Sequence, residues 1–130
     1  MEERRIWMEK PKFEFYTRPN GHNEFLKFYN TLPYKDRRKL MATIEIIEKE
    51  GMIVAFQLEL VKKIDYEIYE IRSKISSNIQ RVLYFHSNNN KYIVTHGFTK
   101  KTPKTPVREI QHAKMIKVEY EEEQYANNKI

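Results

Sequence analysis

Residues 66–104 read YEIYEIRSKISSNIQRVLYFHSNNNKYIVTHGFTKKTPK, and this stretch decides the fold. It contains three segments rich in β-branched and aromatic residues: Tyr66–Lys74, Ile79–His86 and Tyr92–Phe98. Short runs of Ser and Asn separate the segments, and such runs are typical of turns. The sequence therefore predicts three consecutive antiparallel strands joined by short links.

Side chains alternate between the two faces of a strand, so each predicted strand divides into two sets. Glu70 and Arg72 share a face of the first strand, and Arg81 shares a face of the second strand with Leu83 and Phe85. One face of an antiparallel sheet can remain solvated. We therefore expect Arg72 and Arg81 to be neighbours on a wet face.

In the third strand, strict alternation places His96 on one face with Tyr92, Val94 and Phe98. A basic segment without apolar residues, Thr99–Lys104, follows this strand directly.

The residues before this stretch predict a short strand and two helices. Lys12–Thr17 alternates between apolar and other side chains, as a strand does. Apolar residues at helical spacing predict helices over His22–Leu32 and Tyr34–Glu50, which should form a hairpin on one face of the sheet. Met52–Leu60 fits either an irregular connection or a short helical turn.

The residues after the basic segment predict a C-terminal helix. Thr105 and Pro106 fit an N-cap followed by proline at the first helical position. We expect this helix to fade into the acidic run Glu119–Glu123. The expected fold is therefore α+β, a small antiparallel sheet with an N-terminal helical hairpin and a C-terminal helix.

The chain has 130 residues, 32% of them charged and 13% aromatic, which predicts one globular domain with its core at about residues 11–118. No run approaches the roughly 18 apolar residues that cross a bilayer. Met1–Arg5 is not followed by the apolar segment of a secretion signal. Cysteine is absent, which excludes disulfides and thiol catalysis and fits a cytoplasmic location.

The positive charge is concentrated in the predicted sheet. Residues 62–108 contain ten Lys or Arg and three Asp or Glu, whereas the whole chain has a net charge of +6. Such an asymmetry is expected of a surface that binds a polyanion. A solvated basic face is the alternative explanation.

Metal and cofactor sites are not expected. The four histidines lack the spacing of a metal motif, and three glycines leave no phosphate-binding loop. What remains is a set of cations near strand ends: Lys62, Lys63, Arg72, Arg81, Lys100, Lys101 and Lys104.

RNA can be cleaved without a metal, because its 2′-hydroxyl attacks the adjacent phosphate. This reaction needs a base, positive charge on the transition state and an acid for the leaving oxygen. Guanidinium groups suit the second task through bidentate contacts. The alternative for Glu70 and Arg72 is an ordinary surface ion pair.

Three blocks carry a resemblance to a known family: YEIR at residues 69–72, QRVLYF at residues 80–85 and IVTHGFTKKTPKTP at residues 93–106, followed by REI at residues 108–110. Over about residues 11–116 the chain closely resembles the phage-derived HigB-like branch of the RelE/ParE toxin superfamily. The resemblance implies a RelE-like fold and cleavage of mRNA on the ribosome. It also implies a neutralising helix-turn-helix antitoxin of the HigA type as partner, without a membrane or a cofactor.

The resemblance also implies roles for single residues. Arg81 and Lys101 would neutralise the phosphate in the transition state, Arg72 would position the strand, and Glu70 or His96 would take the 2′-hydroxyl proton. Ribosomal RNA would be bound by the remaining lysines: Lys62, Lys63, Lys100 and Lys104. Glu70 stands where RelE-like toxins have a basic residue, and their C-terminal tyrosine has no match here.

Two other functions are weighed against mRNA cleavage. A ParE-like toxin shares the fold but inhibits DNA gyrase, and such toxins typically lack the cations found here. The third possibility is a nucleic-acid-binding module without activity.

Overall fold

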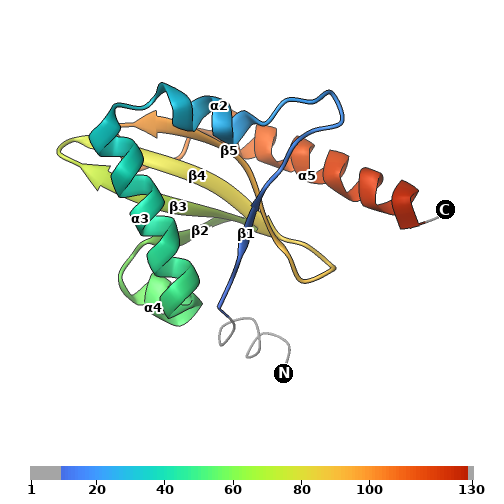
Figure 1. Cartoon of the computed structure of the whole chain (residues 1–130), viewed down its shortest axis with the longest axis horizontal. Helices are drawn as coiled ribbons and strands as arrows, with labels where there is room; N and C mark the ends of the chain where they lie inside the picture. The colour runs from blue at the N-terminus through green and yellow to red at the C-terminus, as the bar shows by residue number, and fades with distance from the viewer. Residues whose placement is uncertain (1–9, 129–130) are drawn as a thin grey trace.

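The computed structural model describes residues 10–128, which form an α+β fold around a five-stranded sheet (Figure 1). The strand order is β1-β5-β4-β3-β2. The elements, in chain order, are β1 (Phe13–Phe15), α2 (Glu24–Thr31), α3 (Tyr34–Glu50), α4 (Met52–Gln57), β2 (Val61–Asp65), β3 (Ile68–Ile75), β4 (Asn78–His86), β5 (Tyr92–Lys100) and α5 (Val107–Asn128).

The three predicted strands are confirmed as β3, β4 and β5, which pair antiparallel in sequence order. Two features were not predicted. Residues 61–65, for which no strand was predicted, form the edge strand β2. β1 pairs parallel with β5, so that the sheet is mixed and not wholly antiparallel. The long connection from β1 through the helices permits this parallel pairing, which a tight turn does not.

Helices cover both faces of the sheet. One face packs against α2, α3 and α4 through a core that includes Phe25, Leu40, Ile47, Val82 and Tyr84. The other face packs against α5. Figure 1 shows α3 crossing the strands and α5 extending from the sheet toward the C-terminus.

The face that carries the arginines is therefore not wet. Arg81 and Glu70 are both 0% exposed, although they belong to the set that we expected to face solvent. The expectation of a wet face was wrong because α5 and the segment that leads into it lie over this face. Arg72 and Arg81 do lie directly opposite each other, as expected.

A bulge in β5 changes which side chains share a face. Leu83 pairs with His96 but Tyr84 pairs with Val94, so Thr95 is an extra residue. Val94 therefore packs with the core under α2–α4, whereas Phe98 packs under α5. Strict alternation, which grouped His96 and Phe98 with Val94, was wrong for this strand.

The helices agree with the periodicity more closely than the bulged strand does. α3 has the predicted bounds and ends at Gly51, whose φ is +91°. Met52–Leu60 resolves into the short helix α4. α5 does not fade in the acidic run but continues through it, because Glu119 binds Arg18 and Glu123 accepts a hydrogen bond from the hydroxyl of Tyr16.

None of the helices in residues 10–128 is both long and apolar enough to span a bilayer. Met1–Arg5, where the sequence predicted no secretion signal, lies outside the described residues.

Candidate functional site

Glu70, Arg72 and Arg81 form an ion cluster that spans β3 and β4 on the face of the sheet covered by α5. Nε of Arg72 lies 2.5 Å from Oε1 of Glu70, and Nη1 of Arg81 lies 3.4 Å from the same oxygen. The strands position these groups because Glu70 and Arg72 are two residues apart on β3 and Arg81 faces Arg72 on β4. Two guanidinium groups thus share one carboxylate, and the cluster keeps a net charge of +1.

A short segment covers this cluster, and we call it the strap (residues Lys101–Lys104). Arg81 donates to the carbonyl oxygens of Thr102 and Pro103, the latter at 2.8 Å. Arg72 donates from Nη2 to the same Pro103 oxygen, also at 2.8 Å. Arg81, predicted to neutralise the phosphate, and Arg72, predicted to position the strand, therefore both donate to neutral main-chain groups.

Thr105, the residue that follows the strap, also binds the cluster. Its hydroxyl donates to Oε2 of Glu70 and accepts from Nη1 of Arg81 at 3.2 Å. The sequence predicts an N-cap at Thr105, but α5 begins at Val107 and the Thr105 side chain binds Glu70 and Arg81 instead. The one available signal was a polar residue placed next to proline, which does not distinguish the two roles.

The surroundings of the Arg81 guanidinium disfavour its charged form. Burial lowers its pKa, the carboxylate of Glu70 opposes this shift, and the neighbouring Arg72 adds to it. Within the described part of the chain, Nε of Arg81 has no hydrogen-bond partner. Arg81 is a buried cation that shares its only carboxylate partner, Glu70, with Arg72, so its positive charge is only partly balanced. Such a site favours the binding of an anion.

A pocket of about 400 Å³ lies beside the cluster, and we call it the cationic pocket. Its floor is largely apolar and none of its lining residues is acidic. The lining consists of Lys62, Lys63, Ile64, Arg72, Thr102, Pro103, Lys104, Thr105, Val107 and Ile110. Four of the predicted site residues, Lys62, Lys63, Arg72 and Lys104, thus meet at one pocket.

The three lysines of this pocket are available to a ligand. Lys62, Lys63 and Lys104 are exposed, and residues 10–128 provide no ion-pair partner for any of them. Lys62 lies opposite Glu70 in the pairing of β2 with β3, which places it next to the cluster.

The structure does not bring Lys100 and Lys101 into this pocket. Lys100 ends β5 opposite Ile79, and Lys101 is exposed at the start of the strap. The expected pairing of Arg81 with Lys101 is not seen, because the strap backbone lies over Arg81.

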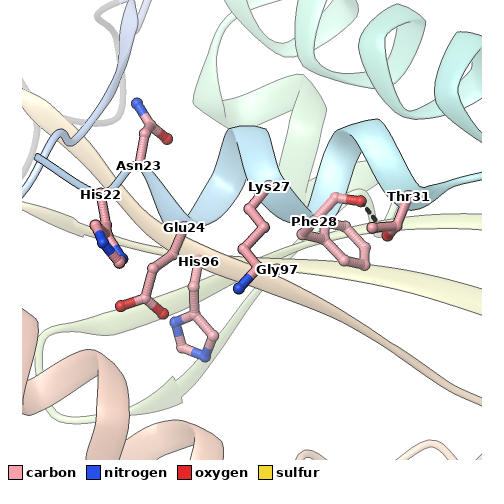
Figure 2. Close-up of a pocket in the computed structure, with 8 residues that line it drawn as sticks. All are labelled: His22, Asn23, Glu24, Lys27, Phe28, Thr31, His96 and Gly97. Carbon is pink, nitrogen blue, oxygen red and sulfur yellow. Dashed lines mark hydrogen bonds between the residues drawn. The ribbon is translucent and has the colours of Figure 1, made fainter.

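His96 belongs to a different pocket, of about 540 Å³, between α2 and β5 (Figure 2). Its ring nitrogens lie 3.0 Å from Oγ1 of Thr95 and 3.2 Å from Oε1 of Glu109. Burial lowers the pKa of His96, the nearby His112 lowers it further, and Glu109 opposes both. These effects favour the neutral form of His96, which lines a different pocket from the cationic one.

A polar network that the sequence analysis missed surrounds His96. The ring of His112 lies 4.7 Å from that of His96 and binds Glu24, which in turn binds Arg18. Burial alone would raise the pKa of Glu24, but its bonds to His112 and Arg18 lower it. These pairs join α2 to α5, which makes the second pocket a structural junction. Among the described residues, no group of three His, Asp or Glu could hold a metal ion.

The comparisons with known proteins give one family. Residues 27–117 match the model of the family described as phage derived protein Gp49-like (DUF891), and this range contains the cluster, the strap and the cationic pocket. No curated protein matches the chain. Because the match covers more than half of the chain, this protein belongs to the Gp49-like family of phage-derived proteins, a family associated with RelE-like toxins.

Proposed function

We propose that this protein is the toxin of a type II toxin-antitoxin system and that it cleaves mRNA on the ribosome, in the cytoplasm. Membership of a toxin-like family supports the first part. The resemblance of residues 69–110 to HigB-like toxins, together with the site described above, supports the second.

One observation carries the proposal. Two guanidinium groups share the single carboxylate of Glu70 beside a pocket lined by three lysines and by no acidic residue, and these lysines have no ion-pair partner within residues 10–128. Such a site is short of negative charge, and a phosphodiester supplies it. The apolar floor, which includes Ile64 and Ile110, suits the flat face of a nucleobase.

The proposed chemistry uses the substrate's own nucleophile. The 2′-hydroxyl gives its proton to solvent water, and its oxygen forms a bond to phosphorus while the bond from phosphorus to the 5′-oxygen breaks. The products are a 2′,3′-cyclic phosphate and a 5′-hydroxyl. Arg72 and Arg81 stabilise the extra charge of the transition state. A lysine ammonium of the cationic pocket gives its proton to the leaving 5′-oxygen.

Glu70 and His96 were the two candidates for taking the 2′-hydroxyl proton. Their placement favours neither, because Glu70 is enclosed by its donors and His96 lines the other pocket. We propose that Glu70 anchors the two arginines, and the proposal rests on charge stabilisation rather than on a named base.

Lys62, Lys63, Lys100, Lys101 and Lys104 would contact mRNA and ribosomal RNA. The proposed protein partner is a helix-turn-helix antitoxin, which would neutralise the toxin when both are made together.

Induced expression in growing cells tests the proposal. Transcript 5′ ends are mapped and gyrase supercoiling is measured in the same cultures. We expect new cleavage ends in messages, unchanged supercoiling, and loss of these ends with Arg72→Ala but not with Lys49→Ala, a charge removed from exposed α3. Intact messages with inhibited gyrase would support the ParE-like function. Arrested translation without cut messages and without a gyrase effect would support a binding module.

A further inference from the structure

The strap is held to the body of the protein in an unusual way. All four of its residues are exposed. Among residues 10–128, its hydrogen bonds are those that the carbonyl oxygens of Thr102 and Pro103 accept from Arg72 and Arg81. The contact that keeps the strap in place is therefore the contact that occupies the two arginines.

The two carbonyl oxygens have the arrangement of an anion's oxygens. They come from adjacent residues and converge on Nη1 and Nη2 of Arg81 and on Nη2 of Arg72. A phosphate offers two non-bridging oxygens to a guanidinium fork in the same bidentate manner. A charged oxygen makes a stronger bond than a neutral carbonyl and also compensates the net charge of the cluster.

We propose that the strap fills a phosphate site in the free protein and that a phosphate group of the ligand displaces it. The carbonyl oxygens of Thr102 and Pro103 hold the places of two phosphate oxygens until an anion arrives. Displacement exposes the buried Arg81 and moves Lys101 and Lys104 with the strap. The identity of the ligand as RNA rests on the proposed function, but the exchange itself requires only a phosphate group.

The exchange explains how a fully buried arginine can serve a large substrate. Arg81 is 0% exposed, and its Nη1 and Nη2 groups donate to the strap carbonyls of Pro103 and Thr102. Glu70 and Thr105 hold its inner side and remain bound during the exchange.

A single fluorescent label tests the exchange. The chain has no cysteine, so Thr102→Cys provides one labelling site, and Thr102 contributes to the cluster only through its main chain. Ser77→Cys, exposed in the turn between β3 and β4, is the matched control. Each labelled protein is titrated with inorganic phosphate, and with a 2′-O-methyl RNA tetranucleotide that cannot react. Sodium chloride of equal ionic strength is the reference.

We expect a saturable change at position 102 with both phosphate ligands, none at position 77 and none with chloride. Arg72→Lys keeps the charge but loses the fork, so the midpoint should shift to at least about tenfold higher phosphate. Calorimetric binding of either ligand without a change at position 102 would overturn the proposal, as would an equal response to chloride.

The outcomes separate this inference from the proposed function. A strap that responds to phosphate in a protein that cuts no RNA leaves the inference standing and overturns the nuclease. If the protein cleaves RNA but its label at position 102 does not respond to bound tetranucleotide, the nuclease function stands and the inference about the strap is overturned.

Discussion

At the scale of single residues, Glu70 supplies the negative charge that balances the arginines of the cluster. It binds Arg72, Arg81 and Thr105 and is fully buried. Glu70→Gln leaves two guanidinium groups near each other without a counter-charge. We expect a loss of about 3–5 kcal/mol in the free energy of unfolding, measured by urea denaturation. Glu45→Gln, on the exposed face of α3, should change it by less than about 0.5 kcal/mol.

Gly97 is a second sensitive position, for steric reasons. A Cβ there would lie 2.4 Å from a ring carbon of Phe28 and 3.2 Å from the carbonyl oxygen of Arg81. Gly97→Ala should therefore destabilise the protein by about 1–3 kcal/mol in thermal or urea unfolding. Adding Phe28→Leu should recover part of the loss, and equal losses in the single and double variants would contradict a clash with this ring.

The sequence revealed the identity of the site's charged residues but not their surroundings. Alternation allowed Arg72 and Arg81 to be neighbours but did not fix the strand register, and the observed pairing of β3 with β4 places them opposite each other. Their burial could not be predicted, because the groups that cover them are main-chain carbonyls, which have no signature in a sequence. Thr105 was missed for a related reason, since its partners come from strands distant in the chain.

At the scale of elements, β5 and α5 are locked together around His96. The bulge at Thr95 turns His96 toward α5, where it meets Glu109 and His112. The bulge was missed because Thr is common in regular strands. The available signal was Gly97, since an isolated glycine within a strand often marks a bulge. Helix periodicity was more informative, since α3 buries Leu40, Ile44 and Ile47 at helical spacing.

This junction predicts a dependence of stability on pH. The pKa of His96 is lowered in the folded protein from about 6.5, mainly by burial, so the unfolded chain binds its proton more readily. The contribution of neutral His96 to the free energy of unfolding is fully present above about pH 6.5. It is lost as the pH falls from there through the lowered pKa of the folded protein. The groups facing it are His112, Glu109 and Glu24.

Urea unfolding at a series of pH values between about 7 and 5 measures this effect. His96→Gln should flatten the fall in stability, whereas His22→Gln, at an exposed position, should leave the fall as it is in the original protein. An unchanged slope in His96→Gln would show that His96 is not the group responsible.

At the scale of the whole molecule, positive charge gathers at one pocket and helices close the rest of the sheet. RNA binding should therefore weaken steeply with salt. Lys62→Ala or Lys104→Ala should each reduce the slope of log affinity against log salt by roughly one unit, measured with a single-stranded RNA of fixed length. Lys49→Ala removes the same charge from α3 and should leave the slope unchanged. If all three changes reduce the salt slope equally, the RNA is attracted by the net charge of the protein and not by the cationic pocket.

The fold class could be predicted because three strand segments, two amphipathic helices and a C-terminal helix each have a strong local pattern. The parallel pairing of β1 with β5 and the edge strand β2 could not, since both depend on which distant segments meet. The same limit applied to the site, where Lys62, Lys63, Arg72 and Lys104 line one pocket and His96 lines another.

The most direct test of the central claim is the chemistry of the RNA ends produced by the purified protein on ribosomes that carry a defined message. The account predicts upstream fragments with a 2′,3′-cyclic phosphate, downstream fragments with a 5′-hydroxyl, and a rate that falls on the order of a hundredfold in Arg72→Ala. An uncut message, fragments with 5′-phosphate ends, or full activity in Arg72→Ala would contradict it.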